Sequence, residues 1–238
     1  MSDNRSMKLA VLIDADNAQA SVVAELLAEV AKFGVASIKR AYGDWTTPNL
    51  KQWKEHLNSH AIQPIQQFSY TQGKNATDAS LIIDAMDILH ENSLDGFCLI
   101  SSDSDFTRLA TRIRESGLIV YGFGEKKTPD AFIAACDKFV FTEILREEKN
   151  TEEVEKYNTP ELRPIVISAI NAVSKDDGWA RLSNVGAYIN KKHPSFDSRN
   201  YGYDKLGKLI RDLNYILLDE RKFNDDSDNV HIYIRIRD

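Results

Sequence analysis

GFCLISSDSDF, residues 96–106, begins as an apolar run and ends in serines and aspartates. An unbroken apolar segment of this kind is typical of a strand that lies buried on both faces of a parallel sheet. Asp103 and Asp105 come directly after this strand. Because ligands bind outside the carboxyl ends of the strands in such sheets, the stretch predicts both the kind of sheet and the edge that carries a site.

A similar arrangement occurs near the start of the chain, where MKLAVLIDADN spans residues 7–17. Asp14, Asp16 and Asn17 follow the apolar part of that strand. Asp16 or Asn17 could simply cap the helix that follows the first strand. In the other stretch Ser104 or Asp103 could cap the next helix in the same way, and capping is the better interpretation for Ser104. Asp14 adjoins a buried strand and needs another partner, which favours a functional role for it.

Around these two stretches strand-like and helical patterns alternate, which predicts an α/β fold with a mostly parallel sheet covered by helices on both faces. The expected strands lie at residues 7–14, 35–42, 62–68, 96–102, 118–124 and 138–143, and the expected helices at residues 21–33, 48–58, 78–90, 104–117 and 128–136. Pro64 interrupts the third strand and indicates an edge position. Thr77 is the expected N-cap of the helix that Asp78 opens.

Asp78 is the third acid expected at this edge of the sheet, behind a loop that contains Lys74. Asp84 lies further along the same helix, rotated by about 120° from Asp78, so the two carboxylates do not share a helix face. We therefore interpret Asp84 as a partly buried structural acid and Asp87 as a surface charge.

Acids at neighbouring strand ends predict a divalent metal site. Carboxylates that lie close together raise one another's pKa, and a cation is the usual compensation; hard oxygen ligands suit Mg²⁺ or Mn²⁺. The net charge of −6 argues against a nucleic acid partner, but it is unevenly spread, with 17 basic and 24 acidic side chains up to residue 159 and 13 and 12 beyond it. Metal ions among the acids would make the first part less negative than this count.

Three motifs in this order, IDADN, KNATDASLIID and LISSDSDF followed by a helix and the strand LIVYGFG, resemble the NYN domain family of PIN-like nucleases. The resemblance implies a PIN-like α/β/α domain over residues 1–145. It carries the family's metal site over to Asp14, Asp78, Asp103 and Asp105, with Asn17 as the polar residue after the first acid. The family pattern does not require Asp16.

The resemblance implies a metal-dependent ribonuclease that hydrolyses RNA phosphodiester bonds, in single strands or loops, and leaves a 5′-phosphate. Asp78 or Asp105 would also orient the attacking water. Lys39, Arg40 and Lys74 are candidate phosphate contacts near the same edge, and ordinary surface charges are the alternative interpretation for each.

Residues 146–161 are predicted to be a charged linker, followed by a second domain over residues 162–238. Three short helices and a β-hairpin are the winged-helix arrangement, and this part resembles the OST-HTH or LOTUS domain. That resemblance implies RNA or a protein as the partner. A broken basic series indicates where a nucleic acid backbone would lie: Lys191, Lys192, Arg199, Lys205, Lys208 and Arg211.

Two other functions fit parts of the sequence. A haloacid-dehalogenase-like phosphatase would use Asp14 as its nucleophile, but Ala18 stands where that motif has Thr or Val. A non-catalytic RNA-binding or regulatory module would keep the fold with an idle site, which the complete set of acids disfavours. Without a signal-peptide core or a membrane-length apolar run, and with only Cys98 and Cys136, we expect a cytoplasmic protein with free thiols and no membrane partner. A homodimer is left open.

Overall fold

The computed structural model describes residues 6–68, 76–91, 93–146, 161–222 and 230–237. The chain divides into two compact units, Met1–Asn150 and Thr151–Asp238. Most of the predicted linker, residues 146–161, lies outside the described residues, so its limits stay a prediction.

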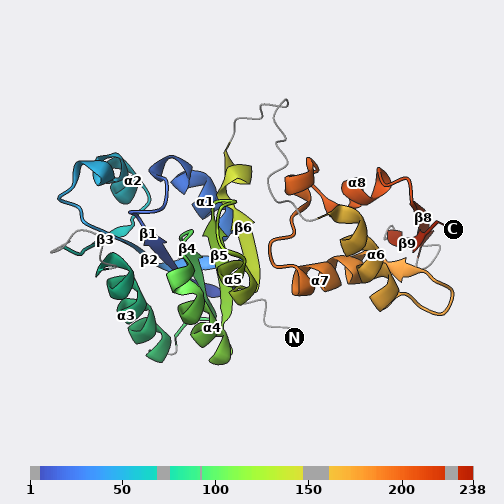
Figure 1. The fold of residues 1–238 in the computed structure, drawn as a ribbon, viewed down its shortest axis with the longest axis horizontal. Helices are drawn as coiled ribbons and strands as arrows, with labels where there is room; N and C mark the ends of the chain where they lie inside the picture. The colour runs from blue at the N-terminus through green and yellow to red at the C-terminus, as the bar shows by residue number, and fades with distance from the viewer. Residues whose placement is uncertain (1–5, 69–75, 92, 147–160, 223–229, 238) are drawn as a thin grey trace. The chain divides into compact units, whose positions relative to one another are not determined.

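The first unit is built on a six-stranded sheet in the order β3-β2-β1-β4-β5-β6, and every neighbouring pair is parallel (Figure 1). The strands are β1 (Lys8–Asp14), β2 (Val35–Gly43), β3 (Gln63–Gln66), β4 (Gly96–Ile100), β5 (Ile119–Gly124) and β6 (Lys138–Phe141). The predicted parallel sheet is confirmed, and the strand with Pro64 lies at its edge, where a missing N–H leaves no gap between two strands.

Helices cover both faces of this sheet, with α1 and α2 on one side and α3, α4 and α5 on the other (Figure 1). The helical segments are η1 (Ala20–Val22), α1 (Val23–Val30), η2 (Pro48–Gln52), α2 (Trp53–Ser59), α3 (Ala76–His90), η3 (Ser104–Phe106), α4 (Thr107–Glu115), α5 (Asp130–Ala135) and η4 (Thr142–Leu145). The α/β/α prediction is therefore confirmed.

The central strands explain why the sheet needs two helical layers. In β1, Leu12 packs into the core beneath α3 to α5, whereas Val11 and Ile13 pack into the core beneath α1 and α2, and all three are fully buried. Burying such a side chain contributes about 1.5–3 kcal/mol. Helices on only one side would leave half of these side chains in water.

The second unit has the helices and hairpin expected of a winged helix. Its elements are α6 (Leu162–Val173), β7 (Ala180–Arg181), α7 (Leu182–Lys192), η5 (Ser198–Tyr201), α8 (Leu206–Arg211), β8 (Ile216–Lys222) and β9 (Val230–Ile236). The predicted hairpin of β8 and β9 is antiparallel, and β7, which the sequence did not predict, adds a third strand beside β9. Val166, Val185, Ile210 and Ile234 are fully buried at the centre of this unit's core.

The predicted N-cap of α3 is wrong. Thr77 is not the N-cap of α3, because the helix already includes Ala76. The buried Thr77 hydroxyl instead donates a hydrogen bond of 2.9 Å to Asp16 Oδ2, which ties the start of α3 to the loop after β1.

Both cysteines, Cys98 and Cys136, are buried free thiols, as predicted. In the described part of the chain, no helix has the length and apolar character that crossing a membrane requires.

Candidate active site

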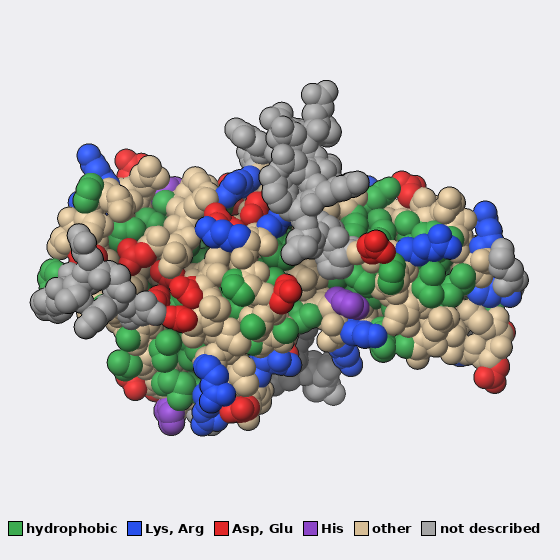
Figure 2. All heavy atoms as spheres, in the orientation of Figure 1, with side chains coloured by type: hydrophobic (Ala, Val, Ile, Leu, Met, Phe, Trp, Pro, Cys, Tyr) green, Lys and Arg blue, Asp and Glu red, His purple; other side chains and the backbone are tan. Residues whose placement is uncertain are grey.

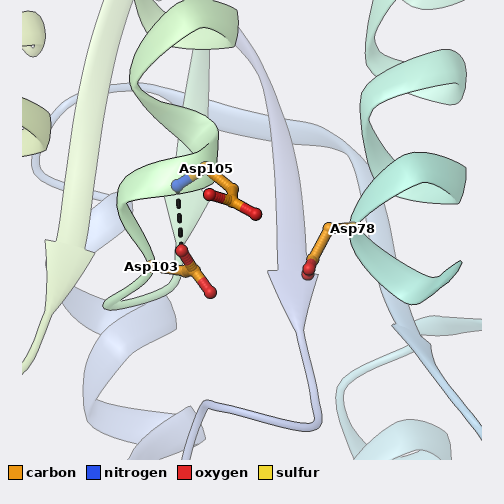
Figure 3. Close-up of side chains that lie close together, drawn as sticks. All are labelled: Asp78, Asp103 and Asp105. Carbon is orange, nitrogen blue, oxygen red and sulfur yellow. Dashed lines mark hydrogen bonds between the residues drawn. The ribbon is translucent and has the colours of Figure 1, made fainter. Parts of the chain in front are cut away.

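Three aspartates meet beyond the carboxyl ends of the central strands. Asp78, Asp103 and Asp105 each offer one carboxylate oxygen, and these oxygens all lie within 4.8 Å of one another. Figure 3 shows that the Asp78 carboxylate approaches from α3, across from Asp103 and Asp105 on the segment that follows β4. In Figure 2, acidic side chains gather on this end of the first unit. The structure thus brings together three of the four acids predicted to bind metal.

Local capping holds two members of this acid cluster. Asp103 is the N-cap of η3, and its Oδ1 accepts a hydrogen bond of 2.9 Å from the Asp105 N–H. The preference for Ser104 as the cap is therefore wrong. This hydrogen bond, drawn as a dashed line in Figure 3, restricts the orientation of the Asp103 carboxylate.

Asp14 lies next to the acid cluster but not within it. The fully buried side chain accepts hydrogen bonds at Oδ2 from Ser101 Oγ at 2.7 Å and from Asn17 Nδ2 at 2.8 Å. Its Oδ1 is buried and has no hydrogen-bond partner among the described residues. A buried carboxylate oxygen without a partner is costly, so this atom calls for a cation or a bound water.

Ser101 joins the two parts of the site, a role that the sequence analysis missed. Its hydroxyl donates to Asp14 and accepts a hydrogen bond of 3.1 Å from the Asp103 N–H. The signal lies in the register: Ile13 pairs with Ile100, so the next residue of each segment, Asp14 at the end of β1 and Ser101 directly after β4, occupies the same level at the sheet edge. The contact between Asp14 and Ser101 can be predicted from the sequence only when β1 and β4 are known to be neighbouring strands.

The pKa values of two acids in the site, Asp78 and Asp14, are raised above their usual values. Burial, followed by the charges of Asp14, Asp103 and Asp105, raises the pKa of Asp78 to about 6. Burial also raises the pKa of Asp14, against the lowering effect of its hydrogen bonds from Asn17 and Ser101. These shifts show that ionising every acid at once is unfavourable in the metal-free protein.

This donor set fits a hard divalent cation. Every candidate ligand atom is a carboxylate oxygen, which is the ligand that Mg²⁺ and Mn²⁺ prefer over nitrogen or sulfur. The unsatisfied Asp14 Oδ1 and the raised pKa of Asp78 would both be relieved by positive charge at this place. Asp78, Asp103 and Asp105 are therefore the residues that would hold the ion, with Asp14 beside them.

The predicted phosphate contacts have other partners. Arg40 forms an ion pair with Asp84, which also accepts a hydrogen bond from the Tyr42 hydroxyl, so Asp84 is the structural acid that the sequence predicted. Lys39 donates to the carbonyl oxygen of His60. Lys74 lies outside the described residues, and RNA contacts by any of the three remain predictions. Asp87 is exposed, as expected of a surface charge.

A polar groove opens beside Asp16, between the loop after β1 and η2. It has a volume of about 520 Å³. Besides Asp16 and Asp44, its polar lining is mostly uncharged and comes from Gln19, Ser21, Thr47, Asn49 and Gln52. Side chains of this kind donate and accept hydrogen bonds, as the edges of nucleobases require.

A parallel α/β/α sheet with aspartates gathered beyond its strand ends places the first unit in the PIN-like class. Residues 8–145 match the model of the NYN domain, more than half of the chain, and the protein belongs to this family. Residues 156–226 match the OST-HTH/LOTUS domain. NYN domains are PIN-like nuclease domains, and OST-HTH/LOTUS domains are RNA-binding modules. The dehalogenase-type interpretation receives no support from these matches.

Solved structures of three proteins resemble parts of the chain. A protein of unknown function from Vibrio parahaemolyticus is 20% identical over 58% of this chain and 94% of its own, with a TM-score of 0.49. An uncharacterized protein from Nitrosomonas europaea is 34% identical over 39% of this chain and 92% of its own, with a TM-score of 0.29. A protein from Chromobacterium violaceum is 38% identical over 33% of this chain and 83% of its own, with a TM-score of 0.27. No curated protein matches the sequence.

Proposed function

We propose that this protein is a metal-dependent ribonuclease whose NYN domain hydrolyses RNA phosphodiester bonds and whose OST-HTH domain holds the RNA. The observation that carries the proposal is the convergence of Asp78, Asp103 and Asp105 within 4.8 Å, in a domain of a nuclease family. The unsatisfied oxygen of the neighbouring Asp14 supports the same site.

The acids bind the ion, orient the water or add charge in this proposal. A bound Mg²⁺ or Mn²⁺ supplies a Lewis acid and makes water a stronger nucleophile. Asp78, Asp103 and Asp105 bind the ion, and Asp78 or Asp105 orients the water for attack on phosphorus. Asp14 is kept in place by Ser101 and Asn17 and adds negative charge behind the ligands.

The substrate proposed is RNA in single strands or loops. The acid cluster repels phosphate unless a cation neutralises it, so productive RNA binding at the NYN domain depends on the metal. The polar groove beside Asp16 has room and hydrogen-bonding groups for an unpaired nucleotide. A duplex, whose bases already use these edges for pairing, would not gain the same contacts.

The direct test incubates end-labelled single-stranded RNA, structured RNA and single-stranded DNA with the purified protein in Mg²⁺, Mn²⁺ or EDTA. We expect RNA to be cut only with metal, and cutting to disappear in Asp103→Asn while the fold is retained. Asp87→Asn is the matched control, because it removes the same charge from an exposed position on α3. Equal cleavage by Asp103→Asn and the wild type would refute the site, and metal-independent RNA binding with no cleavage would identify a non-catalytic module.

Ser101→Ala tests whether the hydrogen bonds behind the ligands position them. The variant loses the donor to Asp14 and the acceptor for the Asp103 N–H, so we expect cleavage to slow by about 10- to 100-fold and the Mn²⁺ affinity to fall. The measurement pairs cleavage rates at saturating Mn²⁺ with a Mn²⁺ titration. Ser104→Ala, a nearby exposed serine, should leave both values close to those of the wild type.

A further inference from the structure

The outer face of the three-stranded sheet in the OST-HTH domain carries aromatic and arginine side chains. In β9 the isoleucines at 232, 234 and 236 pack into the core. Because side chains alternate along a strand, His231, Tyr233 and Arg235 lie on the opposite face. That face is therefore chemically unlike the core side, and it presents rings and positive charge.

Strand register brings further members of the same kind to this face. Arg181 of β7 pairs with Tyr233, and Arg221 of β8 pairs with His231. The Arg221 guanidinium lies 4.3 Å from the centre of the Tyr233 ring and 5.3 Å from that of Trp179. Arg235 lies 5.2 Å from the Trp179 ring centre. We call these five residues the aromatic–arginine face: Trp179, Arg181, Arg221, Tyr233 and Arg235.

Two of these arginines lack a carboxylate partner among the residues that the structure describes. Arg235 stacks on Trp179, and its buried Nε has no hydrogen-bond partner there. Arg181 contacts His231 Nδ1 at 2.7 Å, a group that supplies no negative charge. Arg221 does have an acid beside it, since it pairs with Asp219 at 2.7 Å. Arg181 and Arg235 therefore form no ion pair with a described carboxylate, while Asp177 is a further acid close enough to act on Arg221.

Several members of the basic series that was predicted from the sequence do form ion pairs with acids. Arg199 pairs with Asp197 at 2.7 Å, Lys208 pairs with Asp204 at 2.9 Å, and Arg211 forms an ion pair with Glu220. Lys192 donates to Ser168 Oγ at 3.2 Å. Half of the six-member series thus has its charge offset by a neighbouring acid, which weakens the attraction of that surface for phosphate.

We propose that the aromatic–arginine face is the surface with which this domain binds single-stranded RNA. Unpaired bases stack on aromatic rings and guanidinium planes, and unpaired arginines bind phosphate groups. Trp179 and Tyr233 supply the rings, and Arg181 and Arg235 supply the charge. The choice of RNA as the ligand rests on the proposed function, whereas the placement of the surface rests on the contacts above.

The test measures RNA binding by the full chain in EDTA, so that cleavage does not contribute. The probe is a fluorescein-labelled, mixed-sequence single-stranded RNA of about 20 nucleotides, which is longer than one binding site of ~4–16 nucleotides. Binding is measured as the fluorescence anisotropy of this RNA at several salt concentrations. For the double variant Arg181→Gln with Arg235→Gln, we expect the slope of log affinity against log salt concentration to become shallower by about 1.4, and the affinity at 0.1 M salt to fall roughly 10- to 30-fold. Trp179→Leu should weaken binding roughly tenfold, because stacking is lost.

Lys191→Gln with Lys192→Gln is the matched control, because it removes the same charge from the end of α7. This variant also tests the surface that charge alone favoured: if RNA lies on the outer face of the sheet and not along α7, its affinity and salt dependence stay within about twofold of the wild type. Thermal melts establish that each variant is folded. Wild-type affinity in the arginine variant, an equal or larger loss in the lysine variant, or no RNA binding by the wild type would overturn the proposal. All of these outcomes are separate from the metal-dependent cleavage test.

Discussion

Asp78→Asn is expected to lower metal-dependent RNA cleavage by about a thousandfold or more, while making the metal-free protein more stable. The loss in rate follows from removing a proposed metal ligand, since a bound metal contributes several kcal/mol to transition-state stabilisation. The gain in stability follows from the pKa of about 6, which shows that ionised Asp78 is held unfavourably among its neighbours. One substitution therefore moves activity and stability in opposite directions.

The sign of the stability effect can be worked out for Asp78. Its pKa rises from 3.8 to about 6 on folding, so the folded state binds a proton more tightly than the unfolded state. The free energy of unfolding of the metal-free wild type therefore increases as the pH falls from 7 through 6. Asparagine removes the part of this dependence that comes from Asp78. At pH 7, after allowance for solvent screening, we expect a gain of about 1 kcal/mol and a rise in Tm of about 2–4 °C.

The measurement combines thermal melts in EDTA at pH 5 and pH 7 with cleavage assays in Mn²⁺. Asp87→Asn again serves as the control, and we expect neither its activity nor its pH dependence to differ from the wild type. A lower Tm for Asp78→Asn at pH 7 would contradict the electrostatic account of the cluster. Cleavage at the wild-type rate would contradict its role as a ligand.

Removal of divalent metal is expected to abolish cleavage, and Mn²⁺ should restore it and stabilise the fold. A ligand that binds only the folded state adds about 2.7 kcal/mol at a concentration 100 times its Kd. For a domain of this size the Tm should then rise by roughly 5–10 °C. The measurement is a thermal melt at increasing Mn²⁺ in parallel with RNA cleavage.

The double variant Asp78→Asn with Asp103→Asn is the control for this effect. We expect its Tm to stay nearly constant over the same Mn²⁺ range, because the remaining ligand of the acid cluster binds too weakly. A Tm rise as large as that of the wild type would place the stabilising ion somewhere else. Full cleavage after exhaustive chelation would rule out metal dependence altogether.

Much of the fold could be predicted from the sequence because it depends on local patterns. The apolar runs that became β1 and β4 are unbroken, and Pro64 marked the edge strand. The two-residue strand β7 could not be predicted, since it exists only through its pairing with β9. The capping choice at Ser104 was wrong by one position, and Thr77 lies within α3 instead of capping it. The start of a helical turn depends on contacts such as that of Thr77 with Asp16.

The site was predictable to the extent that strand ends of a parallel sheet share an edge. That rule placed Asp14 at the same edge as Asp103 and Asp105, and the predicted helix start added Asp78 there. The structure brings Asp78, Asp103 and Asp105 together. It could not predict that Asp14 would turn its Oδ2 to Ser101, or that Arg40 would pair with Asp84. Both contacts join segments far apart in the sequence, so they depend on strand register and helix placement. For the RNA-binding surface of the second unit, the charge pattern of the sequence indicated the lysines of α7, whereas the contacts between arginines and aromatic rings indicate the outer face of its β-sheet.

An anomalous difference map from crystals of the full chain grown with Mn²⁺ tests directly whether the acid cluster binds metal. We predict a peak coordinated by carboxylate oxygens of Asp78, Asp103 and Asp105, next to Oδ1 of Asp14. The same crystals of Asp103→Asn should show this peak lost or strongly reduced. A map with no peak among these acids at saturating Mn²⁺, or with manganese bound only at another place, would contradict this prediction.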